Sequence, residues 1–186
     1  LDSGDFVVTC ELNPPKGIDL TDLYEKASVL KDIAVAINVT DSASSRMTMG
    51  NIAAAHLLLD KGVEPILQIT CRDRNRLALQ SEILGAHALG ITNMLFMSGD
   101  PPSGGDHPDA KAVFDLGASE LLSAVRSLES GKDMGGNELK GSPKVFPGAV
   151  VNPGAENLDV EIGRMEEKIE SGARFFQTQA VYEPAA

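Results

Sequence analysis

Short apolar runs alternate with amphipathic helical patterns along the whole chain, and this alternation constrains the fold more than any other feature. Six apolar runs are predicted to be strands, at 6–12, 33–39, 64–70, 92–97, 145–151 and 175–181. Five helices are predicted between them, at 20–31, 47–61, 74–89, 117–130 and 158–171. Strands separated by helices run parallel, are joined by right-handed crossovers and are buried on both faces. The fold class is therefore α/β.

Such a sheet can close in two ways, as an open doubly wound sheet or as a (β/α) barrel. A TIM-type (β/α)8 barrel needs eight strands and usually about 250 residues, whereas this chain has 186 residues and six predicted strands. The chain stops at Tyr182–Ala186, directly after the sixth strand, where a further helix is expected to cover the sheet edge. We therefore expect 1–186 to be a single barrel domain of about six strand-helix units, truncated at its carboxyl-terminal side. The alternative is a shortened form whose open edge pairs with another element.

Composition argues against several classes of protein. With 42% hydrophobic and 23% charged residues, the chain is ordinary for a soluble globular protein. Its 27 acidic and 16 basic residues give a net charge of -11, which argues against a nucleic-acid partner because phosphate binding needs clustered Lys and Arg. No apolar run approaches the roughly 20 residues of a membrane helix, so no membrane partner is expected.

The cysteines and histidines carry no metal or disulfide signature. Cys10 and Cys71 match neither a disulfide framework nor a zinc-binding spacing, which favours a reducing, cytoplasmic setting. His56, His87 and His107 have no partner at metal-ligand spacing. No metal site is therefore predicted.

Two carboxylates lie near strand ends where packing does not require them. Asp100 follows the apolar run Ile91–Met97 in a Gly-rich turn, at the carboxyl end of a strand, where α/β proteins place their chemistry. Glu11 lies on an apolar strand just before Pro14-Pro15, and an unpaired buried Glu is costly, so Glu11 is a candidate for a perturbed carboxyl group. The simpler interpretations are a turn cap for Asp100 and an exposed edge position for Glu11.

The other strand ends add amide and hydroxyl groups. In a barrel all these ends meet at one rim, so side chains from different strands are expected around one pocket. The set is Glu11, Thr40, Asp41, Gln68, Thr70, Asp100, Asn152, Gln177 and Gln179. Together these groups suit a polar heterocycle better than a metal ion.

Five motifs resemble the methylenetetrahydrofolate reductase family in order and spacing, over Phe6 to Glu183. They are Cys-Glu-Leu-Asn-Pro-Pro-Lys (10–16), Val-Thr-Asp-Ser-Ala (39–43), Leu-Gln-Ile-Thr-Cys-Arg-Asp (67–73), Met-Ser-Gly-Asp-Pro-Pro (97–102) and Thr-Gln (178–179). The third and fourth look most like the branch found in corrinoid-linked one-carbon metabolism and in fusions to homocysteine methyltransferase. The resemblance implies a flavin-dependent (β/α)8 barrel, here lacking about two strand-helix units, with a part in methionine biosynthesis.

The resemblance also implies a reaction and the residues that carry it. Such enzymes reduce 5,10-methylenetetrahydrofolate to 5-methyltetrahydrofolate by hydride transfer from reduced FAD. Glu11 matches the family's general acid, which an apolar strand setting would keep protonated. Asp100 matches an acidic residue that touches both flavin and pterin, and whose charge favours cationic folate intermediates. Gln179 matches a folate-contacting glutamine.

Flavin-binding positions carry over with several departures. Gln68 stands where many members have His, Ser98 where many have Arg, and Phe114 and Asn152 where Tyr and His are common. Because Ser98 cannot replace a bidentate Arg at the diphosphate, Lys168 is expected to supply the charge, although a solvated helix face is its simpler interpretation. The positions implied to contact FAD are Thr40, Asp41, Ala43, Gln68, Ser98, Gly99, Asp100, Phe114, Asn152 and Lys168.

The electron donor and the partners stay open. The resemblance permits NAD(P)H or a reduced iron-sulfur protein as donor, with a homo-oligomer or a partner electron-transfer or methyltransferase subunit. One rival is another barrel enzyme with a Schiff-base lysine or a Gly-rich phosphate loop, although no Lys lies in a predicted strand. The second rival is a non-catalytic accessory module that docks onto a partner through its open sheet edge.

Overall fold

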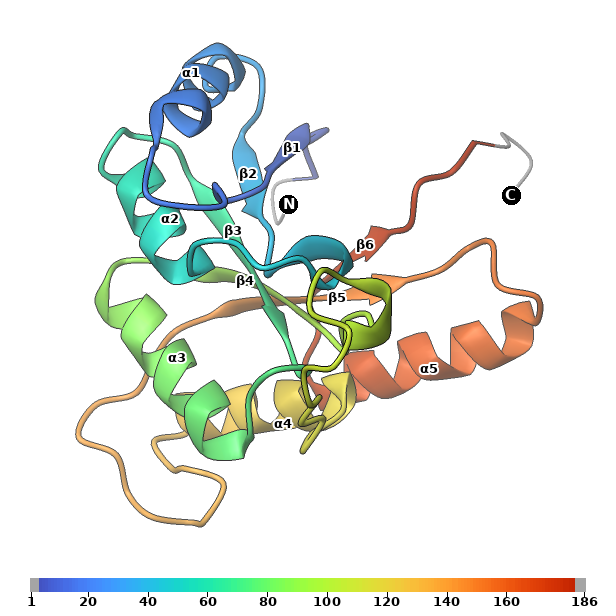
Figure 1. Ribbon diagram of the computed structural model, residues 1–186. Coiled ribbons are helices and arrows are strands. Elements are labelled where there is room, and N and C mark those ends of the chain that lie inside the picture. Colours follow the sequence, from blue (N-terminus) through green and yellow to red (C-terminus); the bar gives the residue numbers. More distant parts are fainter. Residues whose placement is uncertain (1–3, 183–186) are drawn as a thin grey trace.

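Strands and helices alternate through residues 4–182, the part of the chain that the computed structural model describes (Figure 1). The strands are β1 (Thr9–Leu12), β2 (Ala36–Val39), β3 (Pro65–Thr70), β4 (Asn93–Met97), β5 (Phe146–Val151) and β6 (Phe175–Thr178). The α-helices are α1 (Thr21–Leu30), α2 (Asn51–Leu59), α3 (Arg76–Ala88), α4 (Ala118–Glu129) and α5 (Leu158–Ser171). Two short 3-10 helices follow β2 and β4, η1 (Ala43–Ser45) and η2 (Pro102–Gly104).

The strand order decides between the two predicted closures. The strands lie in the order β1-β2-β3-β4-β5-β6, and every neighbouring pair is parallel. A doubly wound sheet reverses its strand order at a switch point, and this sheet does not. The sheet curls with its helices following one another around the outside (Figure 1), so the predicted incomplete (β/α)8 barrel is confirmed.

Strands β2 to β6 contribute to two separate cores. Side chains of the outer face, such as Leu67 and Ile69 of β3, pack with the helices in the larger core. Side chains of the inner face, such as Ile66 of β3 and Leu95 of β4, form a second, smaller cluster against Phe175. All residues of β2 and β3 are buried, as expected of parallel strands covered on both faces.

The first two strands begin later than predicted. The apolar runs start at 6 and 33, but β1 starts at Thr9 and β2 at Ala36. Ile33 and Val35 are more than half exposed, and the backbone N–H of Ile33 still donates to the Leu30 carbonyl in the turn after α1. The two predicted strands are therefore too long at their amino ends, because each apolar run begins in the preceding loop. The sixth strand ends at Thr178 rather than at 181.

Two helices also begin later than predicted, for visible reasons. The backbone N–H of Met47 donates to Asp106 Oδ1 (3.0 Å), and that of Met49 donates to the Pro15 carbonyl (2.8 Å). These contacts hold 47–49 outside α2. In α3, the Asn75 side chain accepts from the backbone N–H groups of Leu77 and Ala78, so the helix starts at Arg76, two residues later than predicted.

The two 3-10 helices touch at the carboxyl ends of the strands. Ser45 of η1 donates its hydroxyl to the carbonyl oxygen of Asp100 (2.7 Å), which precedes η2. A Cβ added at Gly105, just after η2, would lie 1.9 Å from the carbonyl oxygen of Ser45. The loops after β2 and β4 are thus packed backbone against backbone.

This contact predicts that Gly105→Ala destabilises the protein by about 1–3 kcal/mol, because the overlapping atoms belong to the backbone and cannot rotate away. The free energy of unfolding would be measured by urea denaturation. Gly104→Ala is the matched control, since a Cβ there meets nothing within 4 Å, and it is expected to stay within about 0.5 kcal/mol of the parent. Equal unfolding midpoints for the two variants would contradict the packing described.

Candidate active site at the carboxyl rim

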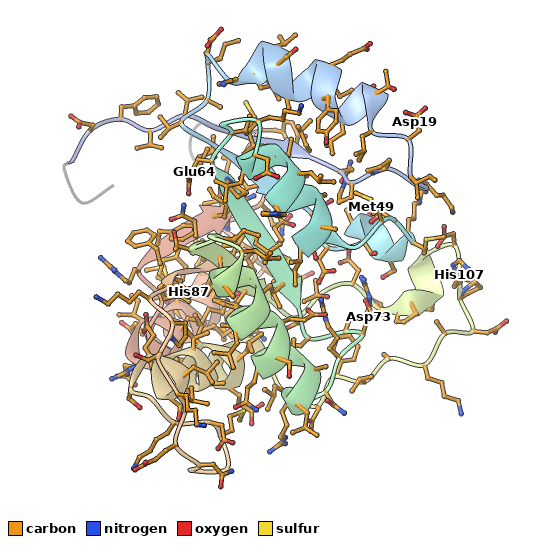
Figure 2. All side chains as sticks on the ribbon, turned by 90° about the vertical axis from the view of Figure 1, so that its left-hand side faces the viewer. Asp19, Met49, Glu64, Asp73, His87 and His107 are labelled. Atoms are coloured by element: carbon orange, nitrogen blue, oxygen red, sulfur yellow. The ribbon has the colours of Figure 1, made fainter. Side chains whose placement is uncertain are left out.

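The carboxyl ends of the strands gather at one rim of the sheet. Figure 2 shows Asp73 and His107 at this end, with Glu64 and His87 at the opposite, amino end. Glu11 of β1 and Gln68 of β3 meet here although 57 positions separate them, because the two strands flank β2 and their long side chains reach across it. The Gln68 amide donates to Glu11 Oε2 over 3.1 Å. Two residues predicted for the site are therefore in contact.

The surroundings of Glu11 differ from those expected. The sequence predicts an apolar strand setting, but Glu11 is exposed, and Leu12 is the only buried residue of β1. The reason is that β1 is an edge strand of the described sheet, paired on one side by β2. Within residues 4–182, the expected apolar setting of this carboxyl group is therefore wrong, and the alternative of an exposed edge position describes it.

A buried guanidinium organises the rim. Arg72, directly after β3, is 3% exposed, and its Nε and Nη2 atoms donate to both carboxylate oxygens of Asp73 over 2.7–3.0 Å. The other bonds from its two Nη atoms run to the loop after β2, to Ser45 Oγ (3.1 Å), the Ser42 carbonyl (3.3 Å) and the Asp41 carbonyl (3.4 Å). The hydrogen bond with Asp73 raises the pKa of Arg72, which keeps the group charged.

The loop that Arg72 holds has an unusual backbone. Ser42, Ser44 and Ser45 all have left-handed φ values, of 48°, 53° and 56°. A non-glycine residue in this region costs of order 1 kcal/mol or more and persists only where the surroundings impose it. The hydrogen bonds that Arg72 donates to Ser42 and Ser45 hold the loop in this conformation. The rim segment between β2 and α2 is thus held in one strained shape.

Several predicted flavin contacts are directed into the protein. The Asp41 carboxylate accepts from the backbone N–H and the hydroxyl of Thr70, both over 2.8 Å, and pairs with Arg74. The Thr40 hydroxyl donates to Asn13 Oδ1 (2.7 Å). Thr40 and Asp41 therefore fix the loop after β2 to its neighbours.

Arg74 also pairs with Glu82 of α3. Burial raises the pKa of Glu82, while the nearby Arg74 opposes that shift. The Arg74 guanidinium thus ties the middle of α3 to the loop after β2.

Other predicted positions face the solvent side of the rim. Ser98, Asp100 and Phe114 are exposed. Gly99 has a φ of +88°, and a Cβ there would lie 2.9 Å from Thr70 Cβ, so this turn requires glycine. Ser98, Gly99 and Asp100 follow β4 directly, and Phe114 lies in the loop between η2 and α4.

The remaining predicted residues lie along β5 and β6. Asn152 is exposed and accepts from Gly154 N through its side chain (3.0 Å). Lys168 of α5 donates to the Val150 carbonyl (2.7 Å), and burial lowers its pKa. Gln179 is exposed just beyond β6. The structure therefore places Lys168 against the β5 backbone.

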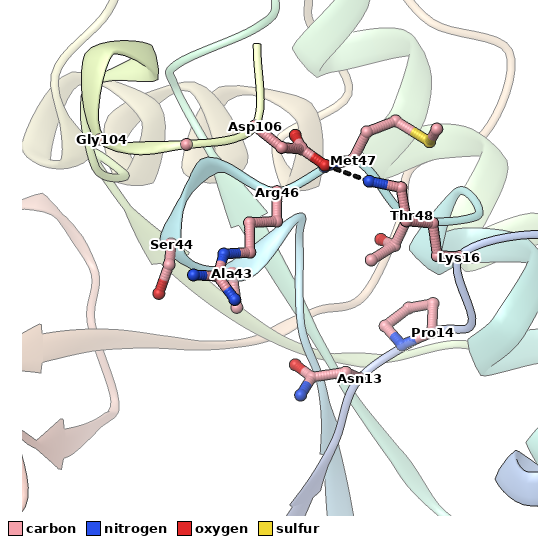
Figure 3. Close-up of a pocket in the computed structure, with 11 residues that line it drawn as sticks. Asn13, Pro14, Lys16, Ala43, Ser44, Arg46, Met47, Thr48, Gly104 and Asp106 are labelled. Atoms are coloured by element: carbon pink, nitrogen blue, oxygen red, sulfur yellow. Dashed lines mark hydrogen bonds and ion pairs between the residues drawn. The ribbon is translucent and has the colours of Figure 1, made fainter. Parts of the chain in front are cut away.

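A pocket of about 640 Å³ lies between the loops after β1, β2 and β4 (Figure 3). It is lined by Asn13, Pro14, Lys16, Ala43, Ser44, Arg46, Met47, Thr48, Gly104, Gly105 and Asp106. Of the residues predicted for the site, only Ala43 lines it. The volume falls within the range of small-molecule sites, roughly 300–1,000 Å³.

Three arginines of the rim, Arg46, Arg72 and Arg74, escaped the sequence-based selection. Arg72 and Arg74 did carry a signal, since each follows a buried strand within four residues in the run Cys71–Arg76, where packing alone offers no reason for charge. Arg46 carried none, because its place in the pocket depends on how η1 folds.

Metal-binding and membrane-spanning features were also sought in the described part of the chain. Among residues 4–182, no group of three or more His, Cys, Asp or Glu side chains could hold a metal ion. No helix in that range has the length and apolar character needed to cross a bilayer. Both cysteines are free, and burial raises the pKa of Cys71 to about 11.

Comparisons with known proteins identify relatives of the chain. A family model described as methylenetetrahydrofolate reductase matches residues 1–186. Methylenetetrahydrofolate reductase 2 of Schizosaccharomyces pombe is 28% identical over 149 residues, which are 75% of this chain and 22% of that protein. Methylenetetrahydrofolate reductase 1 of the same organism is 25% identical over 179 residues, 93% of this chain and 28% of that protein. The chain thus spans about a quarter of the length of these relatives.

A solved structure has the same fold. It is an uncharacterized protein from Clostridium thermocellum that binds two copies of 5-methyl-5,6,7,8-tetrahydrofolic acid. It aligns with a TM-score of 0.59 at 16% identity, over 95% of this chain and 55% of that one. With the family model matching from end to end and the barrel strands in order, the chain belongs to the methylenetetrahydrofolate reductase family.

Proposed function

We propose that the protein takes part in the flavin-dependent reduction of 5,10-methylenetetrahydrofolate to 5-methyltetrahydrofolate. The observation that carries the proposal is the contact of Glu11 with Gln68 at the carboxyl rim of a chain of this family. Asp100 stands on the same rim, and its backbone is fixed by the hydroxyl of Ser45. A proton donor and a second carboxylate on one rim are the groups that this reduction needs.

Several of the predicted flavin-binding residues on the rim are exposed, so a bound flavin can reach them. Ser98, Asp100 and Phe114 are exposed, and Gly99 lets the turn after β4 pack closely against Thr70 because it has no Cβ. These four residues, with Ala43 and Asn152, would hold FAD in our proposal, while Thr40, Asp41 and Lys168 would support the loops from behind. When bound, FAD supplies the hydride that reduces the folate, with electrons from NAD(P)H or a reduced iron-sulfur protein.

Glu11 would deliver the proton that the reaction requires. Opening the five-membered ring of the substrate leaves negative charge on the ring nitrogen that parts from the methylene carbon, and a carboxylic acid can protonate it there. The Gln68 amide suits this task because it can donate to the ionised carboxylate and, after turning, accept from the protonated acid. Gln68 therefore orients Glu11 in both protonation states.

Asp100 would act through its charge. A carboxylate beside the pterin stabilises positive charge that develops on the folate as the ring opens. The same charge beside the flavin disfavours the electron-rich reduced form. Gln179, exposed beyond β6, would donate or accept at the polar edge of the pterin.

The visible absorption spectrum of the protein purified without added cofactor tests the proposal. We expect flavin bands near roughly 380 and 450 nm, which bleach with a reductant and return on adding 5,10-methylenetetrahydrofolate. A colourless protein that also fails to take up added FAD would overturn the flavin-dependent assignment.

Glu11→Gln is expected to lower the rate of folate reduction by about 10²–10⁴-fold while FAD stays bound, since the amide cannot release a proton. Stopped-flow reoxidation of the reduced flavin by the folate substrate would measure the rate. Glu64→Gln is the matched control, because Glu64 also pairs with an amide, Asn93, but at the opposite end of the sheet. Full activity in Glu11→Gln would exclude the acid role.

Asp100→Asn is expected to raise the midpoint potential of the bound flavin, because removing a negative charge makes the reduced form less costly. Folate reduction should slow in the same variant. A reductive titration against a reference dye measures the potential, and Asp109→Asn, in the exposed loop beyond η2, controls for loss of charge nearby. An unchanged potential would remove Asp100 from contact with the flavin.

A further inference from the structure

Arg46 stands apart from the other cations of the rim because its side chain has no partner among residues 4–182. Lys16 pairs with Asp106, Arg72 with Asp73, and Arg74 with Asp41. The Arg46 side chain makes no ion pair or side-chain hydrogen bond with any residue between 4 and 182, and it lines the 640 Å³ pocket. Figure 3 shows its guanidinium extending toward Ser44 and Ala43, away from Asp106.

Asn13 and Ser44 add hydrogen-bond donors to this pocket. Asn13 uses its Oδ1 atom to accept from Thr40, which leaves the amide N–H groups for another partner. The Ser44 hydroxyl has no protein partner among the described residues, and Ser44 lines the same pocket. Guanidinium, amide and hydroxyl donors are the set that binds phosphate and carboxylate oxygens.

The one carboxylate in the lining does not cancel this charge. Asp106 is bonded by Lys16, by the backbone N–H of Met47 (3.0 Å) and by His107 Nδ1 (2.9 Å). These hydrogen bonds, that from Lys16 foremost, hold the pKa of Asp106 well below its usual range. Its oxygens are therefore already engaged, and within the described part of the chain Arg46 is left as an unpaired positive charge on a protein of net charge -11.

We propose that this pocket is an oxyanion subsite in which Arg46, Asn13 and Ser44 bind the anionic end of a ligand. The pocket adjoins the reaction site, since Asn13 lies two residues after Glu11 and the loop of Asp100 runs into Gly104 and Asp106. This inference rests on the proposed function, whose ligands carry two oxyanions: the glutamate carboxylates of the folate and the diphosphate of a dinucleotide. A guanidinium can bind either in bidentate fashion.

Equilibrium binding tests the subsite with Arg46→Met and Arg46→Lys, both compared with the parent protein. The probes are 5-methyltetrahydrofolate and FAD, each paired with an analogue that lacks the oxyanion, 6-methyltetrahydropterin and riboflavin. For the ligand whose oxyanion occupies the pocket, we expect Arg46→Met to weaken binding about tenfold and to leave the truncated analogue unchanged. Arg46→Lys should lose less, because the charge remains without the planar fork.

Two controls separate this effect from damage to the fold. Arg164→Met removes the same charge from an exposed position on α5, where Arg164 pairs with Glu161, and should bind like the parent. Raising the ionic strength should weaken the parent's binding more than that of Arg46→Met, since salt screens the charge that the variant has lost. A general structural defect would not change this salt dependence.

The identity of the ligand that responds assigns the oxyanion. A loss confined to FAD identifies a diphosphate, and a loss confined to 5-methyltetrahydrofolate identifies the glutamate carboxylates. No change for either ligand overturns the subsite. Inorganic diphosphate and p-aminobenzoylglutamate, tested alone, separate the two proposals: fragment binding that depends on Arg46 supports the subsite even if the parent binds neither FAD nor folate. Failure of both fragments, together with both full ligands, overturns the subsite as well.

Discussion

The rim of this barrel depends on the need of one buried charge for hydrogen-bond partners. A guanidinium that is 3% exposed is costly unless its donors are satisfied, and Arg72 satisfies them with Asp73 and with the loop after β2. That loop takes three left-handed serine conformations to reach the guanidinium. The Ser45 hydroxyl in turn donates to the carbonyl oxygen of Asp100 and so holds the loop after β4. The ends of three neighbouring strands are thus fixed around one side chain.

This arrangement separates supporting groups from groups that can meet a ligand. Charges beneath the rim neutralise one another, as in the pairing of Asp41 with Arg74, and they hold the loops in place. Glu11 and Asp100 are exposed, and Arg46 lines the adjoining pocket without a partner among the described residues. When the loops around a site are already fixed, a ligand can bind there without the cost of ordering them first.

The sequence predicted those features of the fold that depend on hydrophobic periodicity and on the order of strands and helices. Alternation of apolar runs with helical patterns gave parallel strands in barrel order, and the rule that strand ends share a rim brought Glu11 and Gln68 to the same place. The patterns failed where tertiary contacts decide. Ile33 and Val35 match a strand pattern but lie exposed in a loop. Within residues 4–182, Glu11 lacks the expected apolar setting because β1 is an edge strand of the described sheet. From the sequence alone, a carboxylate such as Asp41 is equally consistent with contacting a ligand and with pairing with an arginine. In the structure it pairs with Arg74.

The exposure of Glu11 bears on how it could act as an acid. A general acid works best when its surroundings favour the neutral carboxyl group near the operating pH, and burial is the usual means. In the described residues Glu11 is exposed and has only an amide partner, Gln68. In the proposed reaction, the flat rings of the flavin and the pterin would cover this edge of the sheet and remove water from the carboxyl group. Ligand binding would then create the apolar setting that the strand does not provide, and proton delivery would be confined to the state in which substrate is present.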